Sequence, residues 1–261
     1  MSAVKHDEIR QAVREQYGKV AQNRDHLGGG CCGGPVDSNA ISQNLGYSAE
    51  QVGIVPEGAN MGLGCGNPQA IAAIKQNETV LDLGSGGGFD CFLASQQVGS
   101  GGKVIGVDMT PDMVSKARTN ADKGQYANVE FRLGEIESLP VADNSINVII
   151  SNCVINLSPD KARVFAEAFR VLQPGGRLAI SDVVASIDLP KDMADDMALY
   201  TGCMAGASTV AELETMLANS GFVDIQIKPK DDSRSFIRDW VPGSDISEYV
   251  LSASIEAVKP A

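Results

Sequence analysis

The sequence predicts an α/β fold in which a doubly wound, mostly parallel sheet carries helices on both faces and an antiparallel edge strand at the C-terminus. Short apolar runs typical of buried strands alternate with helical stretches through the middle of the chain. A glycine-rich loop follows the first of these runs, which is typical of a ligand-binding turn between strand and helix. The 261 residues are enough to bury one such sheet.

Helices are expected where apolar residues recur every three or four positions. This spacing predicts an amphipathic helix over residues 7–21. Asn67 and Pro68 are typical of a helix start and predict a short helix after them. Pro111 and Pro159 mark the starts of two longer helices. The strands between the helices are expected at residues 79–83, 103–107, 129–133, 146–151 and 177–181.

The C-terminal part of the chain has a different order of elements. Pro174 should end the helix that starts at Pro159, and two helices are expected later, at residues 193–200 and 210–220. Strands at residues 223–228 and 249–258 then follow without a crossover helix, so they predict an antiparallel edge. We divide the chain into an N-terminal helix with glycine-rich loops, a cofactor-binding core and a C-terminal region, at residues 1–66, 67–185 and 186–261.

The composition argues against several kinds of partner. A net charge of −12, from 33 acidic and 21 basic residues, repels nucleic acid and anionic lipid. No apolar run is long enough to span a membrane, and the N-terminus does not resemble a secretory signal. We therefore expect a cytoplasmic protein whose six cysteines are thiols. Both histidines lie near the N-terminus, so the core of the chain offers no imidazole for acid–base catalysis.

The glycine-rich loop predicts the type of cofactor. Gly84, Gly86 and Gly88 have the spacing G-x-G-x-G, which differs from the G-x-G-x-x-G of dinucleotide-binding loops. Asp82, just before the loop, would repel a phosphate and attract an ammonium group. Asp108 ends the next strand, where a carboxylate accepts the hydroxyl groups of a ribose. An adenosine with a cationic amino-acid tail, S-adenosylmethionine, fits both carboxylates.

With these motifs, residues 78–181 resemble the class I methyltransferase family. The resemblance implies that Gly134 and Glu135 lie beside the adenine, and that Asn152 and Val154 line the methionine side. The predicted cofactor-binding residues are Asp82, Gly84, Ser85, Gly86, Asp108, Met109, Gly134, Glu135, Asn152 and Val154.

Three cysteines are expected to meet at one edge of the sheet. Cys153 directly follows a strand, Cys65 lies in the loop before the first strand, and Cys203 follows a later helix. Ligands of open parallel sheets bind outside the carboxyl ends of the strands. Three thiolates beside an electrophilic methyl group suit a soft ion such as arsenic(III). Its lone pair attacks without losing a proton, so no general base is needed.

The segments PEGANMGLGCGNP, SNCVINLSPDK and YTGCMAGA make residues 17–259 similar to the arsenite methyltransferases of microbes. The resemblance implies that Cys153 and Cys203 hold arsenic throughout, for both arsenite and methylarsenite. It also implies that Cys65 and an N-terminal cysteine help to bind arsenite and then form a disulfide, which glutathione or thioredoxin would reduce. Cys31 and Cys32 both remain candidates for that cysteine, and we choose Cys32.

Other interpretations remain open. The chain is alternatively a class I methyltransferase of a small organic acceptor with incidental cysteines, or a module that sequesters a metalloid or zinc without catalysis. Cys91 lies in an apolar helix, so we expect it to pack in the core. Trp240 is likewise expected in a packing role, over the sheet or against the N-terminal helix.

Overall fold

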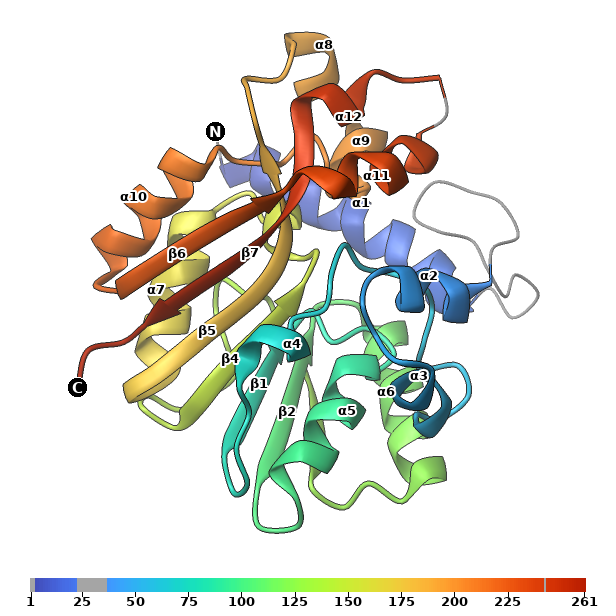
Figure 1. Cartoon of the computed structure of the whole chain (residues 1–261), viewed down its shortest axis with the longest axis vertical. Coiled ribbons are helices and arrows are strands. Elements are labelled where there is room, and N and C mark those ends of the chain that lie inside the picture. The colour runs from blue at the N-terminus through green and yellow to red at the C-terminus, as the bar shows by residue number, and fades with distance from the viewer. Residues whose placement is uncertain (1–2, 23–36, 242) are drawn as a thin grey trace.

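The computed structural model describes residues 3–22, 37–241 and 243–261, and it confirms the predicted fold class. The strands form one sheet in the order β3-β2-β1-β4-β5-β7-β6 (Figure 1). Strands β1 to β5 are parallel, and β7 pairs antiparallel with β5 and β6. The strands are β1 (Thr79–Leu83), β2 (Lys103–Asp108), β3 (Val129–Leu133), β4 (Ile146–Asn152), β5 (Leu172–Ala185), β6 (Val223–Lys230) and β7 (Val250–Val258).

Helices cover both faces of the sheet because the central strands carry apolar side chains on both of their faces. One buried cluster joins the sheet to α7 (Lys161–Val171) and α10 (Val210–Ser220), and another joins the opposite face to α5 (Phe89–Val98) and α6 (Pro111–Gly124). The remaining helices are α1 (Ala3–Gln22), α2 (Ser38–Asn44), α3 (Ala49–Ile54), α4 (Gln69–Ala72), α8 (Lys191–Ala194), α9 (Met197–Thr201), α11 (Arg234–Trp240) and α12 (Ile246–Tyr249).

A third buried cluster lies beyond the carboxyl ends of the strands. It packs α1, α9 and α11 against the loops that follow β4 and β5, and it contains Cys65, Cys153 and Cys203. Trp240 packs against this cluster, and its ring lies 5.5 Å from that of Phe236, in keeping with its expected packing role. Helix α1 thus closes over the edge of the sheet where ligands of this fold bind.

Two expected helices differ from those observed. The helix expected to start at Pro159 begins at Lys161, because Asp160 caps it by accepting a hydrogen bond from the Arg163 amide. It ends at Val171 rather than at Pro174, because Leu172 already pairs with Ile146 in the sheet. Residues 193–200 form two short helices instead of one, because the Asp196 carboxylate caps a new start at Met197.

The N-terminal third of the chain contains two helices that the periodicity did not predict. Asp37 caps α2, and Ser48 forms a capping box with Gln51 at the start of α3. The short helix predicted after Pro68 is α4, which ends after four residues because Ala73 adopts a left-handed conformation, with φ of 45°. Along the described part of the chain, every helix is too short or too polar to cross a lipid bilayer.

Candidate active site at the carboxyl ends of the strands

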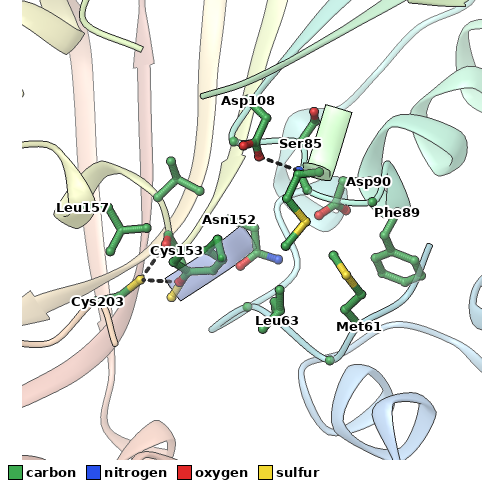
Figure 2. Close-up of a pocket in the computed structure, with 18 of the residues that line it drawn as sticks. Met61, Leu63, Ser85, Phe89, Asp90, Asp108, Asn152, Cys153, Leu157 and Cys203 are labelled. Atoms are coloured by element: carbon green, nitrogen blue, oxygen red, sulfur yellow. Dashed lines mark hydrogen bonds between the residues drawn. The ribbon is translucent and has the colours of Figure 1, made fainter. Parts of the chain in front are cut away.

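A cavity of about 330 Å³ opens at the carboxyl ends of β1, β2 and β4. Helix α1 contributes Arg10 and Tyr17 to its wall, and α11 contributes Trp240. Figure 2 shows Asp108, Ser85 and Asp90 at one end, Cys153 and Cys203 at the other, and Asn152 between the two ends. Residues predicted to bind the cofactor and residues predicted to bind arsenic therefore line one cavity.

The loop after β1 has the backbone shape that its glycines allow. Gly84 and Gly86 have φ of 73° and 50°, in the left-handed region that favours glycine. A side chain at Gly84 would also collide with Val154, which lines the cavity. The Ser85 hydroxyl is buried and finds no hydrogen-bond partner among the described residues. An unpartnered hydroxyl on the cavity wall suits a polar ligand.

Asp108 is held in place by backbone amides of the loops that follow β1 and β2. Its carboxylate accepts hydrogen bonds from the Gly86 amide at 2.9 Å and the Thr110 amide at 2.8 Å. Burial raises the pKa of Asp108 above its ordinary value, although these hydrogen bonds oppose the shift. The carboxylate is thus fixed at the end of β2, in the position expected to receive ribose hydroxyls.

Asp82 and Asp90 add two more buried carboxyl groups to the cavity wall. Burial raises the pKa of Asp82 well above its ordinary value, and the neighbouring Asp90 raises it further. Burial also raises the pKa of Asp90. Arg10 is the only Lys or Arg among the described lining residues, and its guanidinium already contacts Glu137 at 3.0 Å. A ligand with a positive charge would relieve the repulsion among these carboxylates.

Cys91 has a contact that the sequence did not indicate. It is fully buried in the core as expected, and its thiol donates a hydrogen bond to the Asp82 carboxylate at 3.2 Å. Burial raises the pKa of Cys91 well above its usual range, so the sulfur keeps its proton and remains a donor. Cys91 therefore orients Asp82 from behind the cavity wall.

Most of the predicted cofactor-binding residues line the cavity, but two do not. The structure does not bring Gly134 and Glu135 to the wall. The Gly134 amide donates to the Asp108 carbonyl oxygen at 3.0 Å, and Glu135 faces Arg10 at 3.4 Å. Their neighbours Ile136 and Glu137 line the cavity instead. The predicted residues on the wall are Asp82, Gly84, Ser85, Gly86, Asp108, Met109, Asn152 and Val154.

The three cysteines expected to hold arsenic lie together. Cys65 and Cys153 form a disulfide, with their Cα atoms 5.8 Å apart. The Cys203 thiol donates a hydrogen bond to the Cys153 carbonyl oxygen at 2.8 Å and lies 3.8 Å from the Tyr17 hydroxyl. Cys153 and Cys203 line the cavity, whereas Cys65 lies behind its wall.

The disulfide corrects the expectation that all six cysteines are thiols. The end of β4 and the loop before β1 bring Cys65 and Cys153 within bonding distance although 88 positions separate them. A disulfide sulfur cannot act as a thiolate ligand, so the pair must be reduced before it binds a soft ion. Cys31 and Cys32 lie outside the described residues.

Both cysteines on the cavity wall have an uncommon backbone conformation. Cys153 and Cys203 have φ of 59° and 66°, in the left-handed region that residues other than glycine rarely adopt. The Cys153 amide donates to the Ser181 carbonyl oxygen at 2.8 Å, which holds this conformation at the end of β4. Strained backbone of this kind is concentrated at functional sites.

Asn156 and Asp182 join the two cysteine-bearing loops and were not predicted. The buried Asn156 amide donates to the Asp182 carboxylate at 3.0 Å and to the Cys203 carbonyl oxygen at 3.3 Å. Asp182 also accepts from the Ile155 amide at 2.8 Å. Burial raises the pKa of Asp182 to about 6. The order in which the strands pair creates this arrangement, and no local motif signals it.

Comparison with known proteins agrees with this geometry. Residues 74–221 match the family described as "Methyltransferase domain". The chain is 55% identical to the arsenite methyltransferase of Halobacterium salinarum over 98% of its own length and 68% of that protein. It is 41% identical to the arsenite methyltransferase of Aquipseudomonas alcaligenes, over 83% of this chain and 62% of that one.

A solved structure also matches. The crystal structure of the arsenic(III) S-adenosylmethionine methyltransferase from Chlamydomonas reinhardtii is 35% identical, with a TM-score of 0.64, and the match covers 85% of this chain and 74% of that chain. The fold and the cavity therefore define an S-adenosylmethionine-dependent methyltransferase of class I. Within this class, the chain belongs to the arsenite methyltransferase family.

Proposed function

We propose that this chain moves methyl groups from S-adenosylmethionine to trivalent arsenic held by Cys153 and Cys203, with Cys65 as a further thiolate. The observation that supports this proposal is that Cys153 and Cys203 lie at one end of a cavity, beside Cys65, and the carboxyl groups of three aspartates lie at the other end. A soft ion and a cationic methyl donor would then face each other across that cavity.

The polar side chains at one end of the cavity fit the cofactor. Asp108 would accept the ribose hydroxyls, Asp82 and Asp90 would face the ammonium group, and the Ser85 hydroxyl would gain a partner. When bound, S-adenosylmethionine supplies an electrophilic methyl group on a sulfonium. The acceptor brings its own electron pair, so no residue needs to remove a proton at the moment of transfer.

The cysteines bind the substrate by exchanging ligands. Each thiol displaces one hydroxide from arsenite, forming an S–As bond, and the thiol proton leaves with that hydroxide as water. Cys153 and Cys203 would thus orient the arsenic lone pair toward the methyl donor. Their strained backbone supports this role, because it sets the direction of both sulfurs before arsenic arrives.

A thiol reductant is the second partner in this proposal. The Cys65–Cys153 disulfide withholds two of the sulfurs from arsenic, and exchange with a thiol such as glutathione or thioredoxin would release them. The need for reduced sulfurs favours the cytoplasm as the place of action. Arsenite and methylarsenite are the proposed substrates, and the N-terminal Cys32 is proposed to help bind arsenite. In this proposal the chain divides after residues 66 and 185 into an N-terminal region, a cofactor-binding core and a C-terminal region.

Substitution of the cavity-wall cysteines tests the function. Purified Cys153→Ser and Cys203→Ser proteins are incubated with arsenite, S-adenosylmethionine and glutathione, and the arsenic species are separated by chromatography with elemental detection. Each variant should lose all methylated arsenic because a hydroxyl is a poor ligand for arsenic(III).

Binding of S-adenosylhomocysteine, measured by calorimetry, serves as the control for folding and should match the unsubstituted protein. Full methylation by either variant would contradict the proposed site. If the unsubstituted, reduced protein binds the cofactor but produces no methylated arsenic, the acceptor is a small organic molecule instead.

A further inference from the structure

A continuous run of hydrogen bonds leads from the cofactor end of the cavity to the loop that carries Cys65. The Tyr47 hydroxyl donates to the Asp90 carboxylate at 2.8 Å. The Asn152 side-chain amide donates to the Tyr47 oxygen at 3.2 Å. The Asn152 side-chain oxygen accepts from the Cys65 backbone amide at 3.0 Å. Tyr47 thus stands between a cavity carboxylate and the residue that holds a proposed arsenic ligand.

Tyr47 is rigidly placed in this run. Its side chain is buried beside Val52 and Leu93, and its ring packs edge-on against Phe89 at 4.9 Å. Burial raises the pKa of Tyr47 well above its ordinary value, so the hydroxyl keeps its proton. Tyr47 does not line the cavity itself, which means that it acts through its neighbours.

The loop carrying Cys65 depends on Asn152 for its position. Asn152 also donates to the Gly66 carbonyl oxygen at 2.8 Å, so it binds the backbone on both sides of the Cys65 carbonyl. A side chain at Gly64 would meet the Asn152 amide at 2.9 Å, which shows how closely the loop packs on it. Ser252 holds the Cys65 carbonyl oxygen at 2.7 Å. Any rotation of the Asn152 amide therefore shifts the Cys65 backbone.

We infer that Tyr47 is a positioning residue that couples cofactor binding at Asp90 to the placement of Cys65. The inference rests on the proposed role of Cys65. A cation bound beside Asp90 favours its ionised, acceptor form, which strengthens the hydrogen bond from Tyr47. The fixed Tyr47 oxygen then orients the Asn152 amide and tightens the loop. Because coupling is reciprocal, arsenic bound at Cys65 strengthens cofactor binding by the same factor.

The test measures the exposure of Cys65 rather than methylation. Reduced protein is treated with iodoacetamide, with and without S-adenosylhomocysteine, and the alkylation rate of the Cys65 peptide is followed by mass spectrometry. In the unsubstituted protein the ligand should slow Cys65 alkylation about tenfold, a typical size for coupling between sites. Because Cys65 is buried and does not line the cavity, its alkylation requires movement of the loop that carries it.

Tyr47→Phe keeps the buried ring and removes the hydroxyl, so the ligand should no longer slow alkylation of Cys65. Tyr126→Phe is the matched control, because this tyrosine also packs on a phenylalanine but its hydroxyl donates to the Ile54 carbonyl oxygen, at 3.4 Å, and to no other described residue. It should retain the tenfold slowing. Calorimetry with S-adenosylhomocysteine identifies a Tyr47→Phe protein that is folded and binds ligand.

Asp90→Asn provides a second variant in case Tyr47→Phe does not fold. The amide keeps the shape of the carboxyl group without its charge, so the slowing of Cys65 alkylation should fall. Retained tenfold slowing in a folded Tyr47→Phe protein would overturn the inference, as would an unsubstituted protein whose Cys65 is not protected. The alkylation assay contains no arsenic, so its outcome does not depend on the outcome of the arsenic-methylation test.

Discussion

Three aspartates determine how the cavity responds to pH. The pKa of each carboxyl group, Asp82, Asp90 and Asp108, is raised by burial. Below these raised values the groups are protonated, and a cationic ligand has fewer negative charges to meet. The dissociation constant for S-adenosylmethionine should therefore fall as the pH rises above the ordinary aspartate pKa of 3.8.

Calorimetry of cofactor binding across that pH range checks the prediction, and proton release on binding should accompany it. Asp82→Asn should weaken binding and reduce the number of protons released. An affinity that does not change with pH would contradict the assignment of these carboxylates to the cationic end of the ligand.

Asp182 gives a prediction about stability. Its pKa is raised from 3.8 to about 6 in the folded protein, so the folded state binds the proton more tightly than the unfolded state. The resulting stabilisation is fully present below pH 3.8 and is lost as the pH rises through about 6. A pKa difference of about two units between the folded and unfolded states corresponds to a loss of about 3 kcal/mol of unfolding free energy.

Asp182→Asn should remove this part of the pH dependence of the unfolding free energy. Urea unfolding of both proteins at several pH values measures the slope, which is separate from the constant cost of the altered hydrogen bonds. Equal slopes for the two proteins would show that Asp182 is not the group responsible.

Residue contacts were the hardest feature to predict from the sequence. Asp82 and Asp108 line the cavity, and the sequence pointed to them because each lies in the last two residues of a strand, next to a recognisable turn. The hydrogen bonds of Tyr47 with Asp90 and of Asn156 with Asp182 join positions 43 and 26 residues apart. Neither pair has a local pattern, because strand order and loop packing bring the partners together.

At the scale of elements, strands were predicted more accurately than short helices. The central strands β1, β2 and β4 are mostly buried and consist largely of apolar residues, so their positions follow from hydrophobicity. Helices such as α2 and α8 span only seven and four residues, too few to show a helical period. The start of α2 depends on its cap, because the Asp37 side chain accepts a hydrogen bond from the Asn39 amide in the first turn.

The start of α10 offers a test of one such cap. The Thr209 hydroxyl accepts from the Glu212 amide at 3.3 Å, and the Glu212 carboxylate accepts from the Thr209 amide at 2.8 Å. Thr209→Ala should lower the unfolding free energy by about 1 kcal/mol in urea. Thr215→Ala, in the exposed middle of the same helix, is the control and should change it by less than about 0.5 kcal/mol. An equal loss of unfolding free energy in both variants would show that the cap has no special role.

At the scale of the whole molecule, the sheet order places the cysteines. Because β4 lies between β1 and β5, the loop before β1 and the segment after β5 meet at the end of β4. The sequence predicted this meeting from the general position of ligand sites in open parallel sheets. It did not predict the Cys65–Cys153 bond, because distances between sulfurs depend on the packing of the loops.

The disulfide should make stability depend on redox conditions. It joins residues separated by 88 positions, and in the chain-entropy model a loop of this size stabilises the folded state by about 4 to 5 kcal/mol. Urea unfolding with and without a reductant should reveal the difference. In Cys65→Ser the unfolding free energy should be the same with and without the reductant. A difference that persists in this variant would point to other cysteines.

The left-handed backbone of Cys153 and Cys203 has a consequence for protein engineering. A search for thermostable variants favours glycine or asparagine at such positions, since they relieve the strain. The same changes would delete the two sulfurs that we propose as arsenic ligands beside the methyl donor. Selection for heat resistance alone should therefore give stable proteins that no longer methylate arsenic. A library intended to keep activity should leave Cys153 and Cys203 unchanged.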